Sequence, residues 1–302
     1  MSLGGAEHLL AHGPYRAVVT EVGAGLRLLQ HAGRDLVLSY PAGTIRPRFA
    51  GALLAPWPNR IRDGRYRLNG TSYQLPVTEP DRQNALHGLV VWARFDAQRP
   101  DDATATLTHR LVPIPGYPFE VEIEARYELG DGGLTTTITA RNLGRTTAPW
   151  GTAAHPYLLG GDGLVDSWTL SLPATEVLDV SPDRLLPESS GPVGQDMDFR
   201  VPREIGSTEL DHAFTGLVPG TDGLAQVRLH GRSSHGVQCT WDPAVLPWVQ
   251  VHTCDLPGSA ESRRGLALEP MTCPPDAFNS GTGLIRLAPG AEHTAAWTLG
   301  AI

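Results

Sequence analysis

The stretch 119–143, FEVEIEARYELGDGGLTTTITARNL, alternates apolar and polar residues over two segments separated by a turn. In its first half Phe119, Val121 and Ile123 would project from one face of a strand, and the intervening glutamates from the other face. Asp131-Gly132-Gly133, between the halves, has the composition of a tight turn. The pattern predicts two antiparallel strands with one buried and one solvated face.

The same strand-and-turn pattern recurs on both sides of this stretch, and helical periodicity is nearly absent. Asn69-Gly70, a strong hairpin signal, joins the predicted strands 65–68 and 71–75. About a dozen strands, linked by loops rich in the 34 glycines and 26 prolines, indicate a large antiparallel β-sandwich. No linker, repeat or change of composition divides the chain, so residues 1–302 are predicted to form a single domain. The other predicted strands are 15–20, 26–31, 36–40, 103–111, 168–172, 225–229, 237–241, 248–253, 284–287 and 294–299.

The charged residues and cysteines narrow the possible functions. A net charge of -8 argues against nucleic acid or an anionic membrane surface as partner. All 24 basic residues are arginine, which excludes a Schiff-base or P-loop lysine. The three cysteines have no disulfide or zinc spacing, so we expect reduced thiols and no metal. Without a membrane segment or leader, a cytoplasmic protein that needs no cofactor is the expectation.

A second stretch, 265–279 (GLALEPMTCPPDAFN), places a carboxylate against a proline. In a strand, Glu269 would lie on the face opposite Leu266 and Leu268, and Pro270 would end the strand near that point. We therefore expect Glu269 to be half-buried at the end of a strand, where its pKa can be tuned. A solvated carboxylate at a strand end is the alternative.

Four more polar clusters occur along the chain. The first is a proline-stiffened loop that contains Asn59 and Arg60. These side chains could form a hydrogen-bond fork that binds hydroxyls or an anion, or Arg60 could pair with a carboxylate. His87 precedes a glycine, and His155 precedes a proline, among small residues. Either histidine could be structural, but His155 is the best general-acid candidate. Asp211 could cap a turn or accept hydrogen bonds from vicinal sugar hydroxyls.

Taken together, these residues favour one type of chemistry. A glutamate, histidines, an arginine and an aspartate, without lysine, metal motif or nucleotide loop, indicate proton transfer on a polyhydroxylated substrate. No GxSxG elbow is present and no cysteine has a catalytic context, so acyl transfer is disfavoured.

Five short motifs resemble those of the family of aldose 1-epimerases (galactose mutarotases), and they occur in the family's order. They span positions 58 to 279. The motifs are Pro58-Asn59-Arg60-Ile61 with Gly64-x-Tyr66, Leu86-His87-Gly88, His155-Pro156-Tyr157, Asp211-His212-x-Phe214, and Glu269-Pro270 followed by Pro275-Asp276-Ala277-x-Asn279.

The resemblance implies a galactose mutarotase-like β-sandwich that interconverts the α and β anomers of a free monosaccharide. It implies that Glu269 is the general base and His155 the general acid, and that His87 assists at the anomeric centre. Arg60 and Asp211, with Asn59 beside Arg60, would then bind the sugar. A monomer or a homodimer is expected.

Some positions depart from the family's pattern. Leu158-Leu159-Gly160 stands where the family often has an aromatic residue and an asparagine, Met271 where glutamine is common, and His252 where tyrosine is usual. These changes bear on which sugar is bound more than on the reaction.

Three alternatives remain open from the residues. A glycoside hydrolase would use Asp211 and Glu269 as paired carboxylates. A sugar-binding or sensor protein on the same fold would bind without exchanging anomers. A sugar-phosphate epimerase would bind phosphate through a group of arginines. These arginines are Arg46, Arg48, Arg60 and Arg62.

Overall fold

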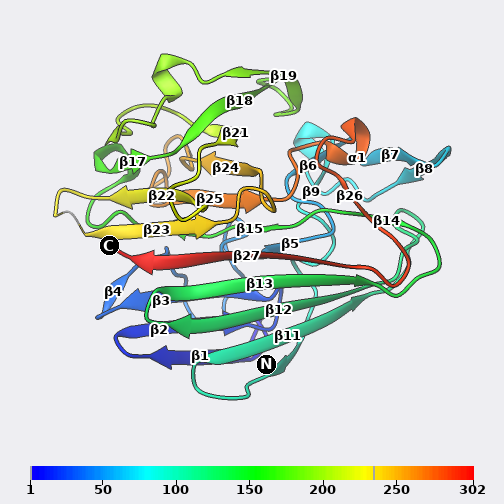
Figure 1. The fold of residues 1–302 in the computed structure, drawn as a ribbon, viewed down its shortest axis with the longest axis horizontal. Coiled ribbons are helices and arrows are strands. Elements are labelled where there is room, and N and C mark those ends of the chain that lie inside the picture. The colour runs from blue at the N-terminus through cyan, green and yellow to red at the C-terminus, as the bar shows by residue number, and fades with distance from the viewer. Residues whose placement is uncertain (1, 234) are drawn as a thin grey trace.

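The structure is a computed structural model that describes residues 2–233 and 235–302. Antiparallel strands make up nearly all of its regular structure, and three large sheets contain most of them (Figure 1). Within the described residues, the one α-helix is the single turn α1 (Ala277–Ser280). Short 3-10 turns occur at Pro80–Arg82, Val165–Ser167 and Gln195–Met197. The prediction of an all-β antiparallel fold is confirmed.

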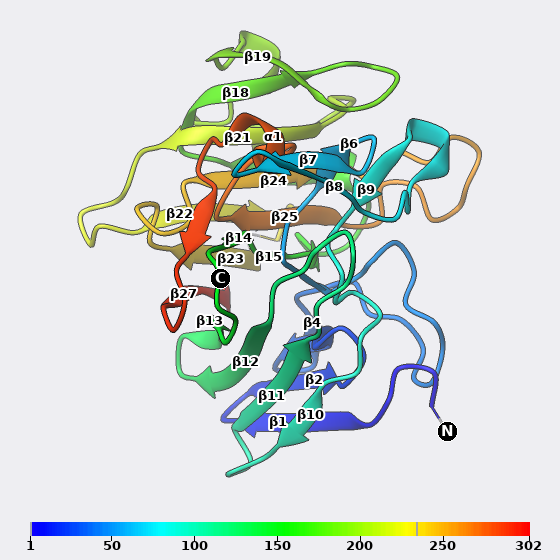
Figure 2. The same ribbon diagram turned by 90° about the vertical axis from the view of Figure 1, so that its right-hand side faces the viewer.

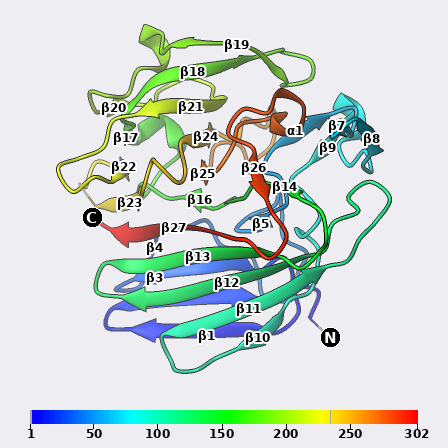
Figure 3. The same ribbon diagram turned by 45° about the vertical axis from the view of Figure 1, so that its right-hand side comes forward.

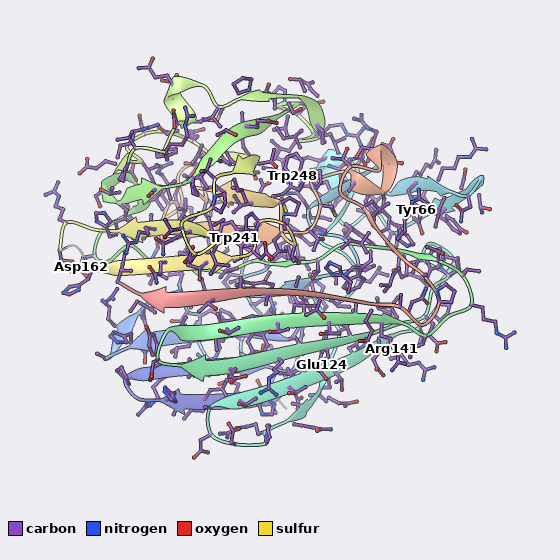
Figure 4. The ribbon with its side chains drawn as sticks, viewed as in Figure 1. Tyr66, Glu124, Arg141, Asp162, Trp241 and Trp248 are labelled. Carbon is purple, nitrogen blue, oxygen red and sulfur yellow. The ribbon has the colours of Figure 1, made fainter. Side chains whose placement is uncertain are left out.

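The largest sheet has nine strands and contains the stretch 119–143 as two long neighbouring strands. The alternation places Val121, Ile123 and Ala125 in the core. Glu124 and Arg141 lie on the outward face (Figure 4). In spatial order the strands are β10 (Asp96–Gln98), β11 (Thr104–Leu111), β12 (Val121–Gly130), β13 (Gly133–Asn142), β27 (Glu292–Ala301), β23 (Gly236–Trp241), β22 (Ala225–His230), β17 (Thr169–Ser171) and β20 (Arg203–Glu204).

Two further sheets cover the inner face of the nine-stranded sheet. The four-stranded sheet packs β1 and β2 against β11 and β12 (Figure 2). The six-stranded sheet occupies the other end of the molecule, near β22 and β23 (Figure 3), and shares a continuous hydrophobic core with the rest. The first has the order β1 (Glu7–His12), β2 (Tyr15–Thr20), β3 (Gly25–His31), β4 (Arg34–Asp35); the second has β16 (Tyr157–Leu158), β25 (Leu266–Met271), β24 (Trp248–His252), β21 (Asp211–Leu217), β18 (Ala174–Val180), β19 (Pro187–Pro192).

Four two-stranded pairs complete the fold. The predicted Asn69-Gly70 hairpin is one of them, and both of its turn residues have positive φ. The pairs are β5 (Leu53–Leu54) with β15 (Ala153–Ala154), β6 (Arg60–Arg62) with β9 (Asn84–Leu86), β7 (Arg65–Leu68) with β8 (Thr71–Gln74), and β14 (Ala148–Trp150) with β26 (Ile285–Leu287).

The predicted strand 36–40 is wrong. Leu36 donates a backbone hydrogen bond to Leu29 of β3, whereas Leu38 donates one to Tyr157 of β16. The segment therefore crosses between two sheets and does not form a ladder within either one. Conversely, the sequence interpretation missed several strands of two or three residues and four longer ones, β1, β18, β19 and β21. Asp211, considered as a turn cap, instead opens β21.

Candidate active site

Glu269 lies inside the six-stranded sheet, on β25. It is only 1% exposed, so the expectation of a half-buried residue at a strand end is wrong. The strand also continues past Pro270 to Met271. Pro270 is tolerated there because β16 pairs only with Leu266 and Ala267, which leaves that edge of β25 without a ladder partner farther along.

The register of three strands gathers polar side chains on one face of this sheet. Gln250 of β24 is opposite Glu269, and His252 is opposite Asp211 of β21. Opposite residues, and residues two apart, share a face. Glu269, Gln250, His252 and Asp211 therefore line the same face, although 58 residues separate Asp211 from Glu269 in the chain (269 minus 211).

His155 meets Glu269 from the segment between β15 and β16. Its backbone N–H donates to Ala52 and its carbonyl accepts from Gly51, so the main chain is fixed on both sides. Its Nε2 lies 3.3 Å from Oε1 of Glu269, and the imidazole is buried. An imidazole nitrogen and a carboxyl oxygen thus lie next to each other, shielded from bulk water.

His87 completes this centre from the residue after β9. Its ring is edge-on to that of His155, with 5.2 Å between ring centroids, and Phe49 packs against it at 4.8 Å. The backbone N–H of His87 donates to the carbonyl of Asn59 over 2.8 Å. The loop that holds Asn59 and Arg60 is thereby attached to the histidines.

Arg60 is buried and paired. Its Nε and Nη2 donate to the two carboxylate oxygens of Glu79 at 2.9 and 3.0 Å, and its Nη1 donates to Oδ1 of Asn59 at 3.3 Å. A bidentate pair of this kind fixes the guanidinium plane. The carboxylate partner considered for this arginine is present, and it orients the arginine beside Asn59.

Asp211 is held on the sheet face by Gln250, whose Nε2 donates to Oδ1 of Asp211 at 2.7 Å. The imidazole of His252 lies 4.0 Å from the same oxygen, and its Nδ1 is 3.2 Å from the carbonyl oxygen of Leu210. All six residues predicted for the site therefore lie on segments that are joined by direct contacts or share this sheet face.

Unpartnered polar atoms concentrate at this place. Four buried atoms without a hydrogen-bond partner in the described part of the chain belong to residues of the site: Oε2 of Glu269, Nδ1 of His155, Nδ1 of His87 and Oε1 of Gln250. Buried polar groups in proteins normally have partners, and leaving one unsatisfied costs about 1–3 kcal/mol. The arrangement therefore fits a polar ligand that both donates and accepts hydrogen bonds.

Burial controls the protonation of the acid–base pair. The pKa of Glu269 is raised to about 8, first by burial and then by the nearby charge of Asp211, against the opposing charges of His252 and Arg60. Burial, followed by the charge of His252, lowers the pKa of His155 to about 3. The ligand-free pair therefore carries its single proton on Glu269 at neutral pH. The base and acid roles implied by the resemblance need an ionised Glu269 and a protonated His155; in the ligand-free pair this order is reversed because burial disfavours both charges.

His252 differs from the other two histidines in its electrostatic surroundings. Burial lowers its pKa, but a hydrogen bond with Cys254 and the charge of Asp211 outweigh that effect and raise the pKa to about 9. Burial, with the charge of His155, lowers the pKa of His87 well below its ordinary value. At neutral pH the site thus contains one cationic imidazole, opposite Asp211, and two neutral ones.

Sequence reasoning missed several residues that shape the site. Gln250, a lone amide in the apolar strand WVQVH, was a usable signal, because a polar residue in such a run has to find a partner. Phe49 and Glu79 gave no comparable signal. Among the tryptophans, Trp57, Trp150 and Trp248 are core residues, whereas Trp92 is 52% exposed and its ring centroid lies 6.1 Å from that of Phe49.

No group of His, Cys, Asp or Glu in residues 2–233 and 235–302 is arranged to hold a metal ion. The three cysteines are free and buried. Among those same residues, no helix is long and apolar enough to cross a membrane.

Gly88, next to His87, lies close to the backbone of Ala55. Its φ is +79°, and a Cβ there would overlap the carbonyl of Ala55. We expect Gly88→Ala to lower the free energy of unfolding by more than about 1 kcal/mol, measured by urea denaturation. Gly223→Ala is the matched control, because Gly223 has φ +82° but open space around it. Equal losses in the two variants would show that the overlap has no effect.

The structure is thus a β-sandwich that holds a buried carboxyl–imidazole pair, with unpartnered polar atoms around it. The chain belongs to the aldose 1-epimerase family, which it matches over residues 7–299. The predicted family and the galactose mutarotase-like fold are thus confirmed. This family is one of isomerases that act on sugars.

Several individual proteins are similar to this chain. The chain is 36% identical to the uncharacterized protein YihR of Escherichia coli K12 over 286 residues, which cover 94% of this chain and 89% of YihR. It is 29% identical over 178 residues to galactose mutarotase of Rattus norvegicus, covering 52% of this chain and 47% of that one. A solved GalM/aldose epimerase homologue from C. elegans has the same fold, with a TM-score of 0.84, 19% identity and 98% of each chain covered.

Proposed function

We propose that the protein is an aldose 1-epimerase that interconverts the α and β anomers of a free aldose by opening and closing the hemiacetal ring. The observation that supports this most strongly is the 3.3 Å contact between His155 and Glu269 in a buried site with unpartnered polar atoms. Ring opening needs one proton removed from the C1 hydroxyl and one delivered to the ring oxygen. A contacting acid and base are suited to both transfers.

The proposed roles follow from this requirement. Glu269 takes the proton of the C1 hydroxyl while His155 gives one to the ring oxygen, which leaves a protonated Glu269, a neutral His155 and an open-chain aldehyde. Rotation about the C1–C2 bond and the reverse transfers then produce the other anomer. His87 assists at the anomeric centre, and Arg60, Asn59 and Asp211 bind sugar hydroxyls.

The protonation state favoured by burial corresponds to one step of this cycle. The proton on Glu269 and the neutral His155 match the state that follows ring opening. A bound cyclic sugar has to favour the other arrangement, with the proton on His155. The positive charges of His252 and Arg60 lower the pKa of Glu269 and so help it to ionise. The pair holds one proton in both arrangements, so changing from one to the other needs no proton from solvent.

The pH profile is a direct consequence. Below about pH 3 the pair holds two protons and has no base, and above about pH 8 it holds none and has no acid. We expect kcat/KM, corrected for spontaneous exchange, to be level from pH 5 to 7.5 and to fall above about pH 8. Polarimetry across pH 5–9.5 measures this. A kcat/KM that rises from pH 7 to 9 would mean that Glu269 acts as a base without its partner.

Polarimetry also tests the function itself. Freshly dissolved α-galactose, α-glucose and a pentose should reach equilibrium faster with the protein, and at least one sugar should show saturation. Reducing-sugar release from a glycoside would favour a hydrolase that uses Asp211 and Glu269, and saturable binding without acceleration would favour a sensor.

The pairing of the arginines within the protein supports a neutral sugar, not a sugar phosphate, as the substrate. Arg60 and Arg62 are paired with Glu79 and Asp276. Arg48 lies 3.7 Å from Glu261, and Arg46 donates to the carbonyl of Val22. Each arginine considered for phosphate thus has a partner within the protein. Glucose 6-phosphate should therefore be a poorer substrate than glucose. A cytoplasmic location and a monomeric or homodimeric state belong to the same proposal.

A further inference from the structure

The arginine of the proposed sugar site is held by a hydrogen-bonded chain that continues beyond the site. Glu79, which fixes Arg60, also accepts a hydrogen bond from Nδ2 of Asn84 at 3.0 Å. Asn84 is 0% exposed, and the side chain of Glu79 is only 12% exposed. The carboxylate therefore depends on protein groups for its orientation, because little solvent reaches it.

The chain continues into the loop between β18 and β19. Nη2 of Arg184 donates to Oδ1 of Asn84 at 3.2 Å, and Nδ2 of Asn84 donates to the carbonyl of Arg184 at 3.1 Å. This reciprocal pair fixes the amide so that its N–H group is directed to Glu79. An amide without that partner could rotate and present its oxygen to the carboxylate instead.

Arg184 also fastens the turn that carries Glu79. Its Nε donates to the carbonyl of Arg82 at 3.0 Å, and its Nη2 donates to the carbonyl of Gln83 at 3.0 Å. Its Nη2 lies 2.8 Å from Oδ1 of Asp63, next to β6, which carries Arg60. One side chain thus connects both sides of the 60–84 segment from a position 100 residues later in the chain (184 minus 84).

We propose that Arg184 is a positioning residue for sugar binding, which acts through Asn84 and Glu79 to hold Arg60 in the orientation that binds the substrate. This inference rests on the proposed function of Arg60. Arg184 does not act on the reacting atoms, so its replacement weakens the binding of the substrate and of the transition state equally. Uniform weakening raises KM and leaves kcat unchanged.

The test compares Arg184→Met and Arg184→Lys with the wild-type chain. We expect Arg184→Met to raise KM and the calorimetric Kd for the preferred aldose roughly tenfold, which is the effect of losing a hydrogen bond to a positioning group. Its kcat should stay within about twofold of the wild-type value. Arg184→Lys should restore part of the affinity. In a Glu79→Gln background, Arg184→Met should have a much smaller effect. Arg200→Met is the control, because Arg200 pairs with Asp198 on the surface.

A second measurement does not depend on sugar. The Nε–H proton of Arg60, followed by nitrogen-15 NMR, should exchange with water faster in Arg184→Met than in wild type. An unchanged rate together with an unchanged Kd, even if the melting temperature falls, overturns the proposal and leaves Arg184 a structural role. Sugar binding without anomer exchange in the wild type would remove the epimerase function, while the Kd values would still decide the role of Arg184.

Discussion

Glu269→Gln should lower kcat for anomer exchange by about 10²- to 10⁴-fold, the usual contribution of a positioned general base. The amide cannot take the C1 proton, whereas its shape and hydrogen-bonding edge are retained. Because Glu269 carries a proton at neutral pH, its replacement by a neutral amide removes no buried charge. We therefore expect folding and sugar affinity to change little, which separates the chemical step from binding.

Polarimetry gives the rate for this variant, and calorimetry gives its Kd. Glu122→Gln is the matched control. Glu122 is exposed on β12, so this variant should exchange anomers at the wild-type rate. Wild-type-like exchange by Glu269→Gln would refute the assignment of the base. A loss of binding along with the rate would instead identify Glu269 as a ligand-binding residue.

His155→Gln should cause a loss of similar size, about 10²- to 10⁴-fold in kcat, because glutamine can donate a hydrogen bond but cannot deliver a proton. The double variant with Glu269→Gln should be little worse than either single one, since an acid–base pair works as a unit. Polarimetry with the preferred sugar measures the exchange rates of the single and the double variant. His293→Gln, a partly buried histidine of the nine-stranded sheet with a lowered pKa, is the control.

The opposite result for His155 would be equally informative. Full activity of His155→Gln, with Glu269→Gln inactive, would mean that water or another residue protonates the ring oxygen. His87 would then be the residue to replace next, because its ring is 5.2 Å from that of His155.

Much of the fold was predictable from local patterns. Alternation identified β12 and β13, and the Asn69-Gly70 turn identified the β7–β8 hairpin, because both signals are contained within short segments. The segment 36–40 was mistaken for a strand because its composition does not reveal that its backbone bonds go to two different sheets. The division of the chain into domains stays a prediction.

The site was predictable in its residue types and less so in its electrostatics. The candidate residues could be selected because each precedes a proline or glycine or stands in a polar cluster. The depth of Glu269 could not be predicted, because its burial depends on strands β24 and β16 placed by the fold. The protonation of Glu269 and His155 follows from that depth.

Two-dimensional exchange NMR of the anomeric protons, recorded at equilibrium for wild type and Glu269→Gln side by side, tests the central claim most directly. Galactose, glucose, a pentose and glucose 6-phosphate would each be examined. The account predicts strong exchange cross-peaks with at least one free aldose in the wild type, and their loss in Glu269→Gln. Cross-peaks no stronger than those of the sugar alone, with every sugar and despite saturable binding, would contradict it.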